Sequence, residues 1–363
     1  KAFFQGLQKV MTLFFIVFEA FIYVFLGGLA PSADLLGSSG YLSMQFILVF
    51  QLILGGLMVL YMDQVISKYG FGSGVSLFIA AGVSSSIVIR ALSPLNSVGN
   101  WAFGSGQAPV GQVWVFFESL IGRNPLGASL ALATILATVI VFVFAVYAQA
   151  MKIEIPLSFG RVRGHGMRWP LRFLYTSNIP VILTAALLAN IQLWARLLES
   201  WGKPFLGTFI GNTPATGLVA WLYPPNLVHG VITSSITGID FAHAAVYILL
   251  MIAGAVLFSV FWVQTSGMDA AAQAKQMMAS GLQIPGFRRD PRVLEAILNR
   301  YIPSLTVLGG MTIGLLAASA DLMGTLANGT GILLAVMIIY KLYEDIAQHH
   351  MMDMHPALRK MME

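Results

Sequence analysis

The chain alternates long apolar stretches with short polar connections. Eight stretches approach or exceed the roughly 20 mostly apolar residues that a helix needs to cross a bilayer. They lie at residues 4–28, 42–65, 73–93, 128–150, 172–195, 243–265, 302–322 and 329–346. The pattern predicts an all-α polytopic membrane protein with eight transmembrane helices.

Three of these stretches are softened by small residues or proline. The third is rich in glycine, serine and alanine, the fifth contains Pro180, and the seventh contains Gly309 and Gly310. Small residues let helix backbones approach closely, so we expect these helices to pack on protein or to line a cavity. Two further apolar segments, 113–120 and 218–232, are too short or too broken to cross, and we interpret them as interfacial.

The composition supports a membrane protein. Hydrophobic residues make up 57% of the chain and charged residues 10%, whereas soluble domains carry about 25% charged residues. Lipid must therefore cover most of the apolar surface. The chain has no cysteine, which excludes disulfides, thiolate metal sites and cysteine nucleophiles.

The basic residues fix an orientation. If the eight stretches alternate across the membrane with the N-terminus inside, sixteen of the 20 lysines and arginines fall on the inner side. The remaining four are Arg90, Arg123, Arg196 and Lys203. An excess of basic residues marks cytoplasmic loops, so the pattern places the C-terminus in the cytoplasm.

Two basic loops, 151–171 and 266–301, are longer than orientation requires. In the first, Lys152 to Ile155 alternate as in a strand and glycines surround Arg161 and Arg163, which predicts a hairpin that presents arginines.

The second loop contains a predicted helix at 270–278, a basic turn with Arg288 and Arg289, and a helix that begins at Asp290-Pro291. The arginines of both loops either set the topology and contact anionic lipid or dock a phosphate-rich partner such as ribosomal RNA.

Few polar groups lie within the apolar stretches. Glu19 is central in the first, and intramembrane carboxylates are costly and usually functional. The alternative is a protonated carboxyl that bonds to a neighbouring helix. Asn190 has a similar alternative, an interhelical hydrogen bond, and Asp321 at the end of its stretch is expected to be interfacial.

No enzyme, metal or cofactor site emerges from the sequence. The histidines fall in loops or at helix ends, and there is no HExxH or nucleotide-binding pattern. Three alternatives to an enzyme remain open at this point: a channel, a secondary transporter for a small solute, and a structural scaffold. A transporter usually couples through several acids or cations at the midplane, and Glu19 is the one convincing candidate.

Five stretches carry a resemblance to a known family. They are KYGFGSGVSLFIAAGV from Lys68, IEIPLSFGRVRG from Ile153, YTSNIPVILTAALLANIQLW from Tyr175, NRYIPSLTVLGG from Asn299 and GTGILLAVMIIYKLYEDI from Gly329. With them the chain resembles the archaeal form of the SecY family, the large channel subunits of the Sec protein translocon. The resemblance extends over nearly the whole chain.

The resemblance implies a ten-helix fold of two inverted halves, with helices three to ten present here and the first two helices and the plug absent. Residues 1–110 would be the remainder of the N-terminal half with three spans, and 111–127 an external loop. Residues 128–348 would be the C-terminal half with five spans, and 349–363 a cytoplasmic tail.

The resemblance also implies functional residues. The pore ring would consist of Val75, Ile79, Ile182 and Leu334. The lateral gate would include Glu19, Asn190 and Pro180, the last as a point where the helix bends. Ribosome contacts would be Arg161, Arg163, Arg288 and Arg289. From residue type alone, the four aliphatic residues are ordinary packed or lipid-facing side chains.

The expected partners follow from the same resemblance. They are a SecE-type small subunit, a third small subunit, the ribosome, signal sequences, nascent polypeptides and membrane lipid. The expected function is a protein-conducting channel in the cell membrane without a cofactor, and the alternative is the small-solute transporter.

Overall fold

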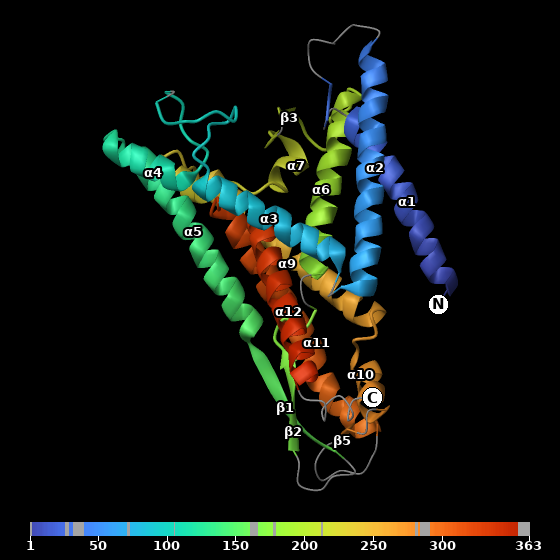
Figure 1. Ribbon diagram of the computed structural model, residues 1–363. Coiled ribbons are helices and arrows are strands. Elements are labelled where there is room, and N and C mark those ends of the chain that lie inside the picture. Colours follow the sequence, from blue (N-terminus) through green and yellow to red (C-terminus); the bar gives the residue numbers. More distant parts are fainter. Residues whose placement is uncertain are drawn as a thin grey trace. The chain divides into compact units, whose positions relative to one another are not determined.

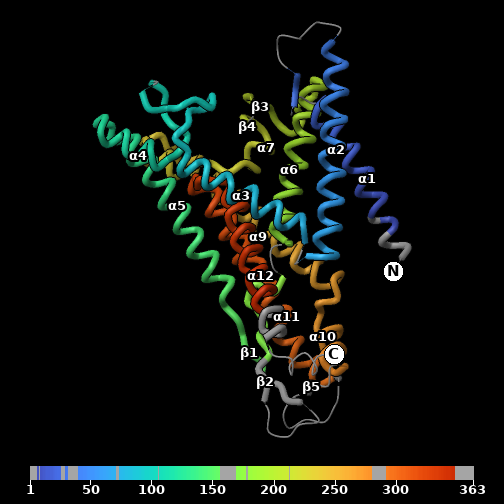
Figure 2. The backbone as a smooth tube through the Cα atoms, in the orientation of Figure 1, coloured from blue at the N-terminus to red at the C-terminus, as the bar shows by residue number. Residues whose placement is uncertain are grey.

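The structure is a computed structural model. It describes residues 2–25, 29–31, 40–70, 73–104, 106–159, 166–176, 179–211, 213–279, 282–283 and 291–354. These are mostly helical (Figures 1 and 2) and divide by their internal contacts into two units. The first unit comprises Lys1–Phe78, Gln192–Gly217 and Glu344–Glu363, and the second comprises Ile79–Ile191 and Leu218–Tyr343.

Each of the eight predicted stretches falls on a helix. The helices are α1 (Ala2–Phe25), α2 (Gly40–Tyr69), α3 (Gly74–Leu92), α5 (Pro125–Ala150), α6 (Ile179–Ser200), α9 (Gly238–Thr265), α11 (Pro291–Leu322) and α12 (Gly329–Met354). Within the described residues, six helices are long and apolar enough to cross a membrane: α2, α3, α5, α6, α9 and most of α11. Membrane crossing by α1 and α12 stays a prediction.

The two segments interpreted as interfacial contain short helices. The first is α4 (Gln112–Ile121), and the second contains α7 (Gly217–Trp221) and α8 (Leu227–Ile232). Helix α4 packs against α5. Asn124 caps α5 by accepting a hydrogen bond from the Gly127 amide at 3.1 Å, and Pro125 at the first helical position suits a helix start.

In the first unit, α1 packs on α2 around the buried side chains of Ala20, Val24 and Val49. The approach is close at Gly56, where an added Cβ would lie 2.7 Å from the Ile16 side chain. This unit also holds the last turns of α6 and the short pair β3 (Phe209–Ile210) and β4 (Thr213–Pro214). Glycine at position 56 therefore leaves room for the Ile16 side chain between α1 and α2.

The start of α3 is capped by a side chain from α2. The Asp63 Oδ1 atom accepts hydrogen bonds from the Ser73 hydroxyl at 3.1 Å and from the Val75 amide at 3.0 Å. A carboxylate suits this place because the first amides of a helix have no partner within it and carry partial positive charge.

In the second unit, α9 and α11 lie side by side (Figure 1) and contact each other extensively. The contact depends on glycines of α11. A Cβ added at Gly310 would come within 2.8 Å of the Ser259 hydroxyl, and one at Gly314 within 2.8 Å of the Met251 carbonyl oxygen. Lipid tails are as apolar as leucine, so close backbone approach is a main source of helix association in a bilayer.

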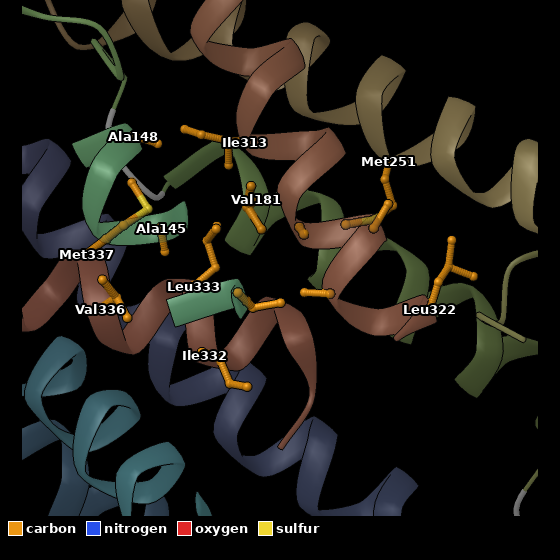
Figure 3. Close-up of a cluster of buried hydrophobic side chains, with 14 of the residues drawn as sticks. Ala145, Ala148, Val181, Met251, Ile313, Leu322, Ile332, Leu333, Val336 and Met337 are labelled. Carbon is orange, nitrogen blue, oxygen red and sulfur yellow. The ribbon is translucent and has the colours of Figure 1, made fainter. Parts of the chain in front are cut away.

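The main core gathers side chains from this pair and from three further helices, α5, α6 and α12. Figure 3 shows Ala145 of α5, Val181 of α6, Met251 of α9, Ile313 of α11 and Leu333 of α12 among them. All five are almost fully buried. Side chains as different in size as the alanine on α5 and the methionine on α9 take part in the same core.

The predicted hairpin is confirmed. Strands β1 (Lys152–Phe159) and β2 (Gly166–Arg172) pair antiparallel, with Lys152 opposite Arg172, and β5 (Leu282–Gln283) pairs with β1. This pairing corrects one boundary. Residue 172 was predicted to begin the fifth span, but it ends a strand, so the helix begins at Ile179.

The seventh span is longer than predicted. Instead of a separate loop helix followed by a span at 302–322, the structure has one continuous helix, α11, with Pro303 inside it. Its first turns pack Leu294, Leu298 and Ile302 against β1, β2 and α10 (Ala270–Ala279). Packing along this face accompanies a helix that continues through a residue without an N–H donor.

The glycine contact between α9 and α11 generates a stability prediction. Gly314→Ala should lower the free energy of unfolding by about 1–3 kcal/mol, because the new methyl group would overlap backbone atoms of α9. Unfolding in mixed micelles with increasing SDS measures this free energy.

Gly82→Ala is the matched control. It makes the same change in α3, where an added Cβ has no neighbour within 4 Å. This variant should be neutral or slightly more stable, since alanine favours helices. Equal destabilisation of both variants would contradict a role for close packing at Gly314.

Candidate functional site

An aliphatic cluster joins three helices of the second unit. Ala80 on α3 and Leu334 and Ile338 on α12 are buried, and Ile79 on α3 and Ile182 on α6 pack against them. We call these five side chains the collar. Three of the four residues predicted for the pore ring, Ile79, Ile182 and Leu334, therefore lie in one cluster.

The spacing of residues along α12 explains how it reaches the collar. Leu334 and Ile338 are four residues apart and lie on one helix face. Leu333 and Met337, one position earlier in each turn, belong to the main core. One row of side chains on α12 therefore packs in the main core, and the adjacent row contacts α3 and α6.

A close approach of α12 to α3 accompanies the collar. A Cβ added at Gly331 would lie 3.2 Å from a methyl group of Val83. A larger residue at 331 would push the first turn of α12 away from α3. The glycine therefore permits the spacing at which Leu334 contacts its partners.

The collar has no binding chemistry of its own. Its five side chains carry neither donors nor acceptors, so they cannot orient a substrate, hold a proton or ligate a metal. Leu334 is 8% exposed and Ala80 is 5% exposed. What these side chains can do is exclude water and yield, since they are held by dispersion contacts alone.

Val75, the fourth residue predicted for the ring, belongs to the first unit. Its side chain is 43% exposed, and its amide is bonded to Asp63 at 3.0 Å. It precedes Ile79 by four residues on α3. Its membership of the ring stays a prediction.

Sequence reasoning missed Ala80 and Ile338. Ile338 follows Leu334 by four residues, so helical periodicity would have found it once Leu334 was chosen. No comparable signal marks Ala80, which is a small residue in a stretch rich in small residues.

The residues predicted for the lateral gate are distributed over both units. Glu19 is exposed on α1 in the first unit, and Asn190 and Pro180 lie on α6 in the second. The Asn190 side-chain amide donates to the Ala186 carbonyl oxygen at 2.8 Å, within its own helix. A bond across helices, the alternative expected for Asn190, is therefore not the bond observed, and the gate role stays a prediction.

Pro180 does not act as the sequence suggested. It is the second residue of α6, where no backbone N–H would have a helical partner. The proline therefore removes no internal hydrogen bond. It is buried, and its carbonyl oxygen accepts from the Thr184 hydroxyl at 2.8 Å.

The four predicted ribosome-contact residues, Arg161, Arg163, Arg288 and Arg289, lie outside the described residues. The structure does describe the base from which both loops extend. The Tyr175 hydroxyl donates to the Met268 carbonyl oxygen at 2.7 Å. Burial, with a smaller contribution from Asp269, raises the pKa of Tyr175 to about 12, so this hydroxyl remains a donor throughout the physiological range.

Asp321 has more partners than an interfacial residue requires. Its carboxylate accepts from the Tyr247 hydroxyl of α9 at 2.9 Å and from the Thr330 amide of α12 at 3.2 Å. Among the described residues, no group of three or more histidine, aspartate or glutamate side chains could hold a metal ion. Asp321 therefore connects α11 to α9 and α12 through hydrogen bonds.

Comparisons with known proteins match almost the full length of the chain to one family. The family model described as SecY matches residues 1–343. The protein translocase subunit SecY of Pyrococcus furiosus is 42% identical over 370 residues, which cover 99% of this chain and 77% of that protein.

Solved structures give the same result. One described as "The structure of a protein conducting channel" aligns with a TM-score of 0.80 at 39% identity, over 98% of this chain and 75% of that one. The yeast Ssh1 complex bound to the 80S ribosome aligns with a TM-score of 0.72 at 20% identity, over 95% and 72%, which is a likeness of fold.

Proposed function

The chain belongs to the SecY family and is a multi-pass, pore-forming subunit of a protein-conducting channel, and we propose that the collar is the constriction through which polypeptides pass. As a channel subunit it is not an enzyme. The observation that carries the proposal is the meeting of Ile79, Ile182 and Leu334, from three helices far apart in sequence, in one aliphatic cluster.

The physical argument concerns what a general channel must avoid. A pore for any unfolded chain cannot bind particular side chains or backbone groups. Aliphatic side chains offer no hydrogen bonds to a passing backbone, and a narrow apolar constriction limits ion flow by dewetting. Val75, one turn before Ile79 on α3, would extend this surface.

Glu19, Asn190 and Pro180 are proposed as parts of the lateral gate. A polar seam stays closed while nothing apolar lies beside it. A nascent segment at the seam can then partition into lipid, where each central leucine gains about 0.3–0.6 kcal/mol and each central charge costs about 2.5–3.5 kcal/mol. Pro180 would fix where α6 starts and so where it can pivot.

The basic loops are proposed as the ribosome-docking surface. Arginine forks suit phosphate oxygens, and the fold relative in yeast is ribosome-bound. The Tyr175 hydroxyl bonded to Met268 would steady the base of both loops. We also propose a SecE-type partner, a third small subunit, location in the cell membrane and a cytoplasmic C-terminus.

The collar is tested by replacing Ile79, Ile182 and Leu334 with glycine in the complete translocation complex. The ion conductance of the channel should rise several-fold, because the apolar constriction widens and wets. Single-channel recording in planar bilayers measures it.

A matched control uses the same three helices. Ile89, Leu187 and Ile339 are 52%, 47% and 51% exposed, and their replacement by glycine imposes a similar helix cost without touching the collar. If both triple variants conduct alike, or neither differs from the wild type, the collar is not the constriction.

The gate is tested with Asn190→Leu. Less hydrophobic signal sequences should then suffice for translocation, because a leucine faces lipid at no polar cost when the seam opens. A graded series of signal sequences gives the threshold, and Asn190→Gln, which keeps the amide, should leave it in place. An unchanged threshold in the leucine variant rejects the gate role.

The docking surface is tested with the double variant Arg288→Glu, Arg289→Glu in complex purified from native membranes, where two small chains should copurify. Ribosome affinity should fall about tenfold or more at low salt, since hydrogen bonds to charged groups contribute about 1.5–3 kcal/mol each. The difference should shrink as salt rises.

The double variant with lysine at both positions keeps the positive charge and should bind the ribosome with nearly the wild-type affinity. Ribosome affinity unchanged by charge reversal would remove these arginines from the interface. The C-terminus is checked by placing one cysteine in the tail of this cysteine-free chain, since an impermeant reagent should label it only from the cytoplasmic side.

A further inference from the structure

The turn between α11 and α12, residues 323–328, is held by other helices of the second unit. The Leu326 amide donates to the Thr138 hydroxyl of α5 at 3.0 Å, and its carbonyl oxygen accepts from the Arg90 guanidinium of α3 at 3.3 Å. Leu326 is 5% exposed. Buried backbone groups are costly to leave unpaired, so these two side chains fix where the turn lies.

The two ends of the turn are joined by Asp321. One carboxylate oxygen accepts from the Thr330 amide in the first turn of α12, at 3.2 Å. The other accepts from the Tyr247 hydroxyl of α9, at 2.9 Å. A single carboxylate therefore connects the end of α11, the start of α12 and α9.

The first turn of α12 lies close to the collar. Leu334 follows Gly329 by five residues, which is about 7.5 Å along a helix. Over so short a distance a helix moves as a rigid body, so a shift or rotation at its start is passed to Leu334. The position of the turn therefore determines how Leu334 meets Ile79 and Ile182.

We propose that Thr138, Arg90 and Asp321 are positioning residues for the constriction: they hold the start of α12 so that Leu334 and Ile338 close the collar. This inference rests on the proposed function of the collar. It assigns to three polar residues at the end of the helix bundle a role in sealing a pore that none of them lines.

The test replaces Thr138 with valine, which keeps the shape and removes the acceptor of the Leu326 amide. Thr134→Val is the matched control, one turn earlier on α5, where the hydroxyl donates to the Leu130 carbonyl oxygen of its own helix at 3.0 Å. Both are made in the complete translocation complex, and Leu334→Gly serves as the reference for an opened collar.

The first measurement is disulfide formation between Ile182→Cys and Leu334→Cys, which is unambiguous in a chain without cysteine. Thr138→Val should slow it about tenfold, the factor that 1.4 kcal/mol, near the cost of one lost buried hydrogen bond, makes in an equilibrium. A second pair, Thr176→Cys with Ser259→Cys, whose hydroxyls lie 3.2 Å apart away from α12, should form at the normal rate.

The second measurement is ion conductance, which should rise in Thr138→Val and stay normal in Thr134→Val. Thr138→Ser keeps the hydroxyl and should restore both readings. If Thr138→Val does not fold, Tyr247→Phe removes one hydroxyl bond to Asp321 and should slow the Ile182–Leu334 disulfide in the same way.

The outcomes separate the two proposals. Suppose that Leu334→Gly raises ion conductance above the wild-type level but Thr138→Val matches Thr134→Val in both measurements. The positioning role is then overturned, and the proposal that the collar is the constriction is retained. If Leu334→Gly does not conduct, the collar fails as a constriction, and the disulfide rates alone decide whether these residues position α12. Slower formation of both disulfide pairs would mean general loosening and would overturn the positioning role.

Discussion

The close contact between α9 and α11 is the constraint on which the second unit is built. In a bilayer, apolar side chains gain nothing by leaving lipid for each other, so helices associate where their backbones can touch. Gly310 and Gly314 allow this contact. Helix α12 then fills the main core with Leu333 and Met337, and the adjacent stripe of α12 is left for the collar. The place of the collar, the proposed constriction, is thus a consequence of helix packing alone.

Three of the acids on the described helices, Asp63, Asp240 and Asp321, have a structural use. Asp63 bonds to the start of α3, Asp240 to the residue that precedes α9, and Asp321 to the start of α12. These carboxylates satisfy helix termini, where backbone amides lack partners. A solute transporter needs acids free to bind a coupling ion at the midplane. Composition left that alternative open, and family membership together with these partners favours the channel.

The sequence predicted what depends on local pattern. Long apolar stretches identified the helices, and alternation near Lys152 identified the hairpin. It failed where distant residues decide. The fifth span begins later than expected because Arg172 pairs with Lys152, twenty positions earlier. The partners of Asp321 were invisible because Tyr247 lies 74 residues away in sequence.

The collar itself did not come from pattern at all. In a chain that is 57% hydrophobic, an isoleucine on a helix carries no signal of its own. Ile79, Ile182 and Leu334 were selected by family resemblance, and the structure then brought them together. Ile338 was within reach of helical periodicity, whereas Ala80 was not.

Different parts of helix α12 make different contacts, and this difference affects how the collar can widen. Its first turn is tied by polar bonds through Asp321, and one stripe is locked in the core. Contacts within the collar are dispersion contacts of about 0.1–0.2 kcal/mol per atom pair, each easily broken. Ile79 and Ile182 are only partly buried, unlike Leu334. If the collar is the constriction, as proposed, widening would fall to side-chain rotation and to α3 and α6, with α12 as the fixed wall.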